Sequence, residues 1–226
     1  MLSTWGQLIP LVIGSALVPV QIIITILLLR SKAGRVTAVA WVAGMTAVRL
    51  AQGLLFGVLL GAANSVDATK DGPGPVASTL LLVVAIIFYA KAAKQILKHP
   101  DEDAPPPKWM AGFESIAPGK AFLLGTGVIA IGAKPWVFTL AAITILGEAG
   151  LGQGTTIVAY LVFVLLAECL HLALVVIAYA MPGRAALVLD GIASFMERRS
   201  RAIVIALGLV FGTWFMLTAF KGLGIL

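Results

Sequence analysis

The chain alternates between long apolar runs and short polar connections. Six of the runs reach about 18 residues or more, which is the length that a helix needs to cross a bilayer. They cover roughly residues 7–29, 36–61, 76–97, 121–146, 154–181 and 202–221. The pattern therefore predicts an all-α membrane protein with six transmembrane helices.

Composition supports this fold class. Hydrophobic residues make up 60% of the 226 residues and charged residues 12%, whereas soluble domains carry about 25% charged residues. We therefore interpret residues 1–226 as a single transmembrane domain. The first apolar run follows no Lys or Arg and precedes no small-residue cleavage site, so we expect a retained helix rather than a signal peptide. The single cysteine, Cys169, excludes an intramolecular disulfide.

The charges in the connections predict the orientation. Lys and Arg cluster between spans one and two, three and four, and five and six, while the other two connections hold few basic residues. By the positive-inside rule, both termini face outward and the loop of about residues 98–119 faces the cytoplasm. The net charge of +6 follows from the same clustering, so we do not expect nucleic acid as a partner. Apolar residues at helical spacing in 184–201 predict an amphipathic helix, with an interfacial anchor favoured over a gating or docking role.

Two halves of the chain carry similar landmarks. Repeat one covers about residues 1–97 and repeat two about 120–226, and a half of three helices must be inserted upside down relative to the other. The first and fourth spans each hold a central proline, and the second and fifth each hold a polar pair spaced i, i+3. These landmarks are Pro19 and Pro135, Arg49 with Gln52, and Glu168 with His171. They predict two inverted three-helix repeats.

Three charged residues lie near the middle of predicted spans, namely Arg49, Lys134 and Glu168. Each is about 20 Å from the nearer helix end at 1.5 Å per residue, which is too far for a side chain to reach water. We expect Glu168 to pair with Arg49 or Lys134, leaving one surplus cation that attracts an anionic group. The alternative is a neutral salt-bridge cluster that only fixes packing. His171 could relay protons or simply pack.

Other residues complete the predicted site. A proline inside a span frees a backbone carbonyl one turn back, which a polar substrate can bind. The predicted substrate-binding or coupling residues are Arg49, Lys134, Glu168, His171, Gln21, Gln52, Pro19 and Pro135. No protease, hydrolase or nucleotide-binding motif is present, and no cluster of residues has metal-ligand spacing. We therefore predict no enzyme, no catalytic residue, no metal and no cofactor.

Several stretches resemble a known family. The runs "ALVPVQIIITILLLRSKAGRVTAVAWVAGM", "PGKAFLLGTGVIAIGAKPWVFTLAAI" and "RAALVLDGIASFMERRSRA" resemble the GAP and Sap-type proteins, which are glycolipid- and sulfolipid-addressing proteins of the LysE transporter superfamily. That family usually carries an Asn-Pro-Lys-type motif in its fourth span, where this chain reads G-A-K-P-W. The asparagine is missing and the order is changed, which bears on the substrate more than on the fold.

The resemblance implies a multi-pass protein of the bacterial plasma membrane that transports its substrate or assists its export. The leading hypothesis is a secondary transporter of an anionic or zwitterionic lipid or other amphiphile. One alternative is an exporter of amino acids or small polar solutes, and another is a non-transporting accessory of a larger lipid-export machine. Membrane lipids are expected partners. The glycine ladder Gly53, Gly57, Gly61 favours packing within the protomer over a homodimer face.

Overall fold

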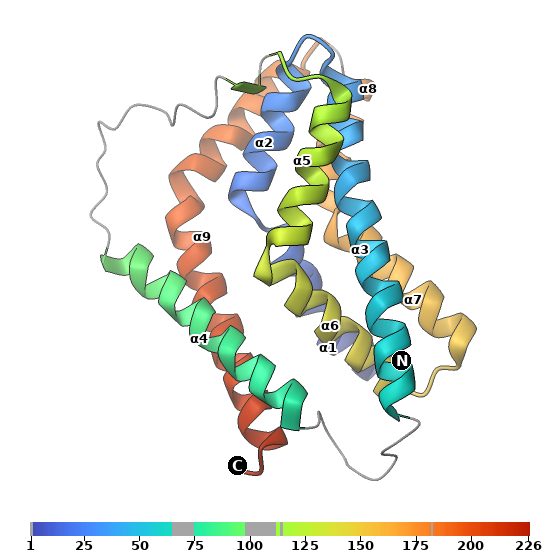
Figure 1. Cartoon of the computed structure of the whole chain (residues 1–226). Coiled ribbons are helices and arrows are strands. Elements are labelled where there is room, and N and C mark those ends of the chain that lie inside the picture. Colours follow the sequence, from blue (N-terminus) through green and yellow to red (C-terminus); the bar gives the residue numbers. More distant parts are fainter. Residues whose placement is uncertain (1, 65–74, 98–111, 114, 182) are drawn as a thin grey trace.

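The computed structural model describes residues 2–64, 75–97, 112–113, 115–181 and 183–226. Helices form the regular structure of this part of the chain (Figure 1). In chain order they are α1 (Leu2–Ala16), α2 (Pro19–Arg30), α3 (Gly34–Asn64), α4 (Pro75–Leu97), α5 (Pro118–Ile131), α6 (Ala133–Glu148), α7 (Gln153–Ala167), α8 (Cys169–Ala180) and α9 (Ala185–Gly222). The all-helical fold class is confirmed. Most of the predicted loop 98–119 lies outside the described residues.

Three of the predicted spans are broken into two helices each. The bend is 54° between α1 and α2, 68° between α5 and α6, and 60° between α7 and α8. Among the described residues, α3 and α9 are long and apolar enough to cross a membrane alone, and the bent pairs raise the number of spans to as many as five. Helix α4, with 23 residues, covers the third predicted span but is not among the candidate spans found in the described residues. Six spans therefore stay a prediction.

Prolines account for two of the breaks. Pro19 is the first residue of α2 and Pro135 lies in the first turn of α6, where a proline ring costs no helical hydrogen bond. Two carbonyls near the end of α5 then find side-chain partners. Gln52 Nε2 donates to the Ile129 oxygen at 3.5 Å, and Trp136 Nε1 donates to the Ala130 oxygen at 2.7 Å. Such partners allow a broken helix to exist where water is scarce.

The third break lies at Glu168, where the sequence has neither proline nor glycine. In the first half, the span that corresponds to α7 and α8 is α3, which runs without a break from Gly34 to Asn64. The two halves therefore agree at the prolines and differ at the polar pairs. The inverted repeat stays a prediction.

Helix α9 corrects one detail of the sequence interpretation. The stretch 184–201, predicted as a surface helix separate from the last span, continues into that span as one helix of 38 residues. Arg201 explains part of this arrangement, because its guanidinium donates to the carbonyls of Gln95 and Ile96 at 2.9 and 3.1 Å. A cation at these last carbonyls stabilises the end of α4 and fixes α4 against α9.

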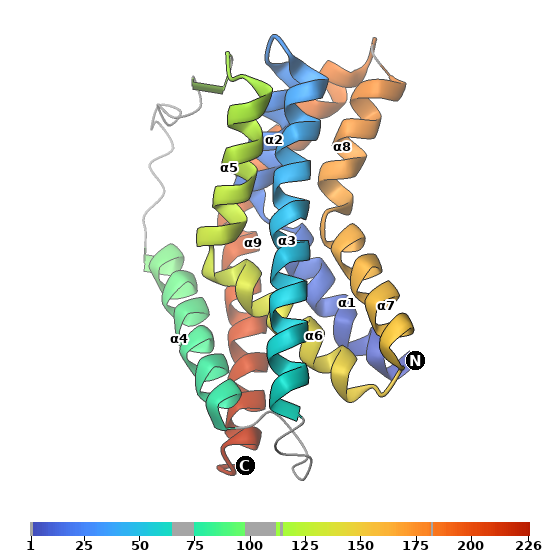
Figure 2. The same ribbon diagram turned by 45° about the vertical axis from the view of Figure 1, so that its right-hand side comes forward.

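The two termini lie at the same end of the bundle, which we call the terminal end (Figures 1 and 2). The turn between α6 and α7 is also there, and its Gly150 and Gly152 adopt the positive φ values that glycine permits. The connections after α2 and α8 lie at the opposite end. This arrangement agrees with the prediction that both termini share one side.

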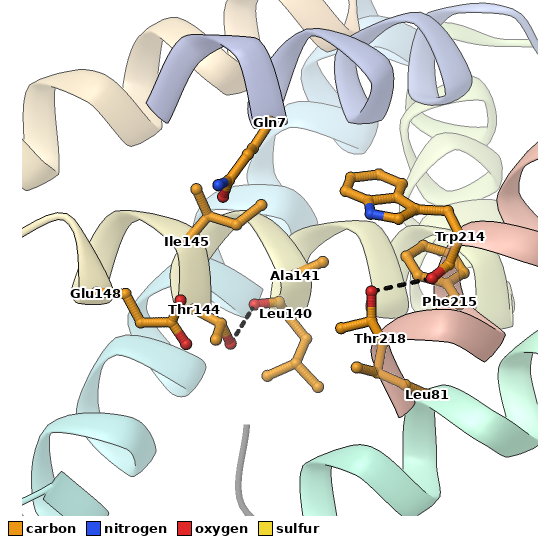
Figure 3. A pocket seen from close by; sticks show the side chains of 10 residues that line it. All are labelled: Gln7, Leu81, Leu140, Ala141, Thr144, Ile145, Glu148, Trp214, Phe215 and Thr218. Carbon is orange, nitrogen blue, oxygen red and sulfur yellow. Dashed lines mark hydrogen bonds between the residues drawn. The ribbon is translucent and has the colours of Figure 1, made fainter. Parts of the chain in front are cut away.

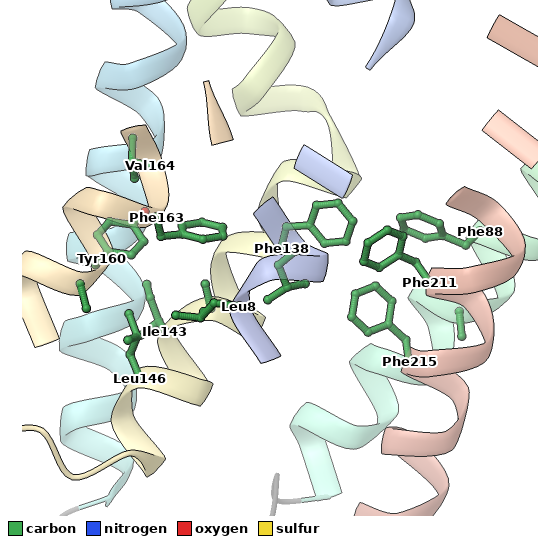
Figure 4. Close-up of a cluster of buried hydrophobic side chains, with 14 residues drawn as sticks. Leu8, Phe88, Phe138, Ile143, Leu146, Tyr160, Phe163, Val164, Phe211 and Phe215 are labelled. Carbon is green, nitrogen blue, oxygen red and sulfur yellow. The ribbon is translucent and has the colours of Figure 1, made fainter. Parts of the chain in front are cut away.

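The core contains a cluster of aromatic rings at the meeting point of α4, α6 and α9 (Figure 4). We call Phe88, Phe138, Phe211 and Phe215 the aromatic cluster. Phe138 has its ring centroid 4.8 Å from that of Phe211 and 5.9 Å from those of Phe88 and Phe215. All four side chains are buried. The cluster therefore joins these three helices through contacts between apolar rings.

Candidate functional site

Arg49 and Glu168 form a buried ion pair between α3 and the break after α7. Arg49 Nε lies 3.3 Å from Glu168 Oε1, and neither side chain is more than 3% exposed. The Thr46 hydroxyl donates to the other carboxylate oxygen of Glu168. The Arg49–Glu168 contact is close but not aligned as a hydrogen bond. Of the two partners expected for Glu168, the structure therefore selects Arg49 rather than Lys134.

Gln52 and the backbone of Arg49 tie α3 to its neighbours. Thr139 Oγ1 donates to Gln52 Oε1 at 3.2 Å, and the Tyr160 hydroxyl donates to the Arg49 carbonyl at 2.5 Å. Both amide ends of Gln52 thus have partners within the protein. Gln52 acts here as a link between helices.

His171 belongs to a separate polar network. Its Nδ1 lies 2.9 Å from the Thr25 hydroxyl, which donates to the Gln21 carbonyl at 2.9 Å. Trp41 Nε1 donates to the same hydroxyl at 3.1 Å. With its one proton used by the Gln21 carbonyl, the hydroxyl accepts from His171, which places a proton on Nδ1. This network holds α2, α3 and α8 together.

A cavity of about 210 Å³ lies at the breaks of α1–α2 and α5–α6, and we call it the basic cavity. Its lining comprises Ser15, Val18, Gln21, Arg49, Lys91, Val128, Gly132, Ala133, Lys134, Pro135 and Phe138. Four predicted site residues meet here, namely Gln21, Arg49, Lys134 and Pro135. Pro19 lines an adjoining cavity. Glu168, His171 and Gln52 are absent from both linings.

The charges in the basic cavity are not balanced by described carboxylates. Arg49 is paired with Glu168, but Lys134 and Lys91 form no ion pair with any described residue. The half-buried Lys134 places its ammonium 5.3 Å from the centroid of the Phe138 ring, a cation–π contact. The cavity therefore has a positive character, to which the first turns of α2 and α6 add their dipoles.

Besides nitrogens of the Arg49 guanidinium, two polar groups of the cavity lining are buried and have no hydrogen-bond partner among the described residues. These are Ser15 Oγ and Gln21 Oε1, with residue exposures of 2% and 7%. Burying such a group without a hydrogen bond is unfavourable. Because rotating the Gln21 amide exchanges its oxygen for an N–H₂ group, both residues can donate to an anion in the cavity.

Sequence reasoning missed Lys91, Ser15 and Phe138. Lys91 is one of the basic residues near the end of the third predicted span, but it stands inside the span 76–97 rather than after it. That position was the available signal. Ser15 and Phe138 offered no signal, because a serine or a phenylalanine is ordinary in a transmembrane helix.

Comparison with known proteins gives one match. A family model described as Sap, sulfolipid-1-addressing protein, matches residues 8–221. The matched region reaches from α1 into the last turns of α9 and contains every residue of the basic cavity. No curated protein and no solved structure matches the chain.

Proposed function

Because the chain belongs to the Sap, or sulfolipid-1-addressing protein, family, we propose that it is a secondary transporter or exporter of an anionic amphiphile in the bacterial plasma membrane. Membership of this family indicates a role in lipid export or addressing. The mechanism, the six-span topology with inverted repeats and the link to the LysE superfamily are parts of the proposal.

The observation that carries the proposal is the surplus of cations in the basic cavity. Charges in the middle of a membrane are costly and mark substrate or ion pathways. In transporters, the substrate site typically lies where helices are interrupted. Lys134 combines both features, because it lies beside the α5–α6 break and has no acidic partner among the described residues. We assign it the role of binding the anionic head group.

The Arg49–Glu168 pair has a different role in this mechanism. It lies beside the cavity and also at the α7–α8 break, so it links the charge state of the site to the angle between two half-helices. Glu168 balances the charge of Arg49 while the cavity is empty. Coupling of transport to a proton through Glu168 is part of the proposal.

A second pocket, of about 290 Å³, lies nearer the terminal end (Figure 3). Gln7, Thr144, Glu148 and Thr218 supply its polar groups. Along three helices, residues of these sites follow one another in the same order. A residue that lines the basic cavity or the adjoining cavity comes first, a phenylalanine of the aromatic cluster comes next, and a residue that lines the 290 Å³ pocket comes last. The series are Lys91, Phe88 and Leu81 on α4, Lys134, Phe138 and Thr144 on α6, and Gly208, Phe211 and Thr218 on α9.

This order supports alternating access. The aromatic cluster separates the basic cavity from the pocket at the terminal end, and rearrangement of the half-helices would open one side while closing the other. The bends at the helix breaks supply the hinges for such a movement.

Transport in proteoliposomes tests the proposal. The protein is reconstituted in phosphatidylcholine vesicles, and movement of a fluorescent phosphatidic acid between leaflets is followed by external quenching. We expect Lys134→Ala and Glu168→Gln to abolish the movement and Lys94→Ala, at an exposed site on α4 outside the basic cavity, to leave it unchanged. Wild-type rates for both correctly inserted site variants would contradict the mechanism.

The same vesicles distinguish the alternatives. An exporter of amino acids would move radiolabelled lysine or glutamate and not the lipid. An accessory of a larger machine would move neither, and in cells its function would depend on the connections between spans rather than on Lys134.

A further inference from the structure

The basic cavity borders an apolar cavity of about 170 Å³, which residues of α4 and α9 line together with the first residues of α2 and α6. Four residues line both, namely Val18, Lys91, Ala133 and Lys134. The remaining residues that line the 170 Å³ apolar cavity are Leu17, Pro19, Val84, Ile87, Phe88, Val204, Leu207 and Gly208. The cavity with the polar side chains thus lies next to an apolar one, and two lysines line both.

Lys91 and Lys134 come from different helices, α4 and α6, and neither has a carboxylate partner among the described residues. Lys91 is exposed at the mouth of the cavity and Lys134 is half-buried. Both line the basic cavity and the neighbouring apolar cavity, so their like charges repel each other. Like charges held together at a cavity border favour an anion that bridges them.

The far wall of the basic cavity offers hydrogen bonds to the same anion. Ser15 Oγ and Gln21 Oε1 are buried without a described partner, and rotating the Gln21 amide turns its N–H₂ group toward the cavity. A group with several oxygens can bind both lysines and still accept from these two residues. A planar carboxylate has only two oxygens, so a tetrahedral oxyanion satisfies this set of donors better.

We propose that the paired cavities bind a sulfate or phosphate monoester of a single alkyl chain. The head group lies between Lys91 and Lys134 and reaches Ser15 and Gln21. The alkyl chain of the ligand enters the apolar cavity between α4 and α9. Each cavity is smaller than the about 300–1,000 Å³ of sites that enclose drug-sized ligands. The pair therefore holds the head group and the first part of the chain, and the rest extends into lipid. This assignment rests on the proposed function and specifies the substrate class of its site.

Equilibrium binding of radiolabelled decyl phosphate tests the head-group contacts, with the full chain in phosphatidylcholine nanodiscs. We expect Lys91→Gln and Lys134→Gln each to weaken binding about tenfold, as for the loss of one charge-assisted hydrogen bond. Lys91→Arg and Lys134→Arg, which keep the charge, should bind within about threefold of the wild type. Lys94→Gln, one turn along α4 and outside both cavities, is the matched control. Equal affinity of Lys91→Gln and Lys94→Gln would overturn the assignment.

The same assay tests the contacts of the alkyl chain with the apolar cavity. Val204→Phe fills the apolar cavity and should weaken decyl phosphate binding about tenfold, whereas Val210→Phe, on the exposed side of α9, should not. Decyl sulfate should compete with decyl phosphate, and decyltrimethylammonium should not. If inorganic sulfate or phosphate competes as effectively as decyl sulfate, the alkyl chain has no role in binding. The ligand of the site would then be a free oxyanion.

The two proposals can fail separately. If Lys134→Ala stops transport while Lys91→Gln and Val204→Phe bind decyl phosphate like the wild type, this assignment is wrong and the proposed function stands. If the variants change binding as expected but the wild type moves no anionic lipid, the assignment stands and the transport proposal is wrong.

Discussion

Arg49 and Glu168 depend on each other because both are buried. A charge enclosed by apolar side chains costs several kcal/mol unless a partner compensates it. Here Arg49 Nε lies 3.3 Å from Glu168 Oε1, and the Thr46 hydroxyl donates a hydrogen bond to Glu168 Oε2. Lys134 has no such compensation from the described residues, apart from the Phe138 ring. At the residue scale, one cation is structural and the other is available for a ligand.

A double-mutant cycle tests this division. Arg49→Gln or Glu168→Gln alone leaves one buried charge unpaired and should lower the free energy of unfolding in detergent micelles by about 3–5 kcal/mol. The double variant should lose less than the sum of the two losses. Arg198→Gln is the control, since the exposed Arg198 donates to the Ser194 carbonyl of its own helix and to no other described residue. Additive losses would contradict the pairing.

Close approach of α3 and α5 is the main packing feature at the element scale. Gly44 on α3 faces the backbone of Phe122, and Gly125 on α5 faces the backbone of Trp41. A Cβ at either glycine would overlap a carbonyl oxygen of the other helix, so only glycine permits this contact. The described part of the predicted ladder is mixed: Gly53 packs against the Tyr160 ring, but a Cβ added at Gly57 would meet nothing within 4 Å.

Alanine substitutions should separate these two kinds of glycine. Gly44→Ala or Gly125→Ala forces α3 away from α5 and should lower the free energy of unfolding by about 1–3 kcal/mol. Gly57→Ala should be neutral or slightly stabilising, because alanine is the better helix former. Unfolding in mixed micelles, followed by circular dichroism, measures both. A loss at Gly57 equal to that at Gly44 would show that this account of the packing is wrong.

The whole molecule is organised around the aromatic cluster between two cavities. Its four rings join α4, α6 and α9, and on all three helices the basic cavity and its apolar extension lie on one side of them and the terminal-end pocket on the other. Closing the path with apolar rings needs no fixed hydrogen bonds, so the helices can separate without leaving polar groups unpaired.

Labelling of a cysteine in the cavity tests this separation. In a Cys169→Ser background, Ser15→Cys should react slowly with a membrane-impermeant thiol reagent added to intact cells, which reaches the terminal end in the predicted orientation. Adding Phe138→Ala or Phe215→Ala should speed the reaction several-fold by removing part of the barrier. Phe195→Ala, at an exposed position of α9, is the control. Unchanged rates in both cluster variants would contradict a closed aromatic barrier.

The sequence alone predicted the membrane class, the helical fold and the charged residues that lie within the helix bundle. It did so because the cost of burying charge is local: Arg49, Lys134 and Glu168 are conspicuous wherever their helices lie. The prolines likewise marked two of the three helix breaks. The sequence left two possible partners for Glu168, Arg49 and Lys134, and in the structure Glu168 pairs with Arg49.

Only the tertiary structure decided which of these residues act together. It placed His171 in a network with Thr25 and Trp41, away from the basic cavity, and it brought Lys91 into that cavity from α4. It also showed that the fifth predicted span bends at Glu168, where no proline or glycine indicates a break. These outcomes depend on the angles between packed helices, which arise from contacts distant in sequence, whereas hydrophobicity and charge are properties of each residue by itself.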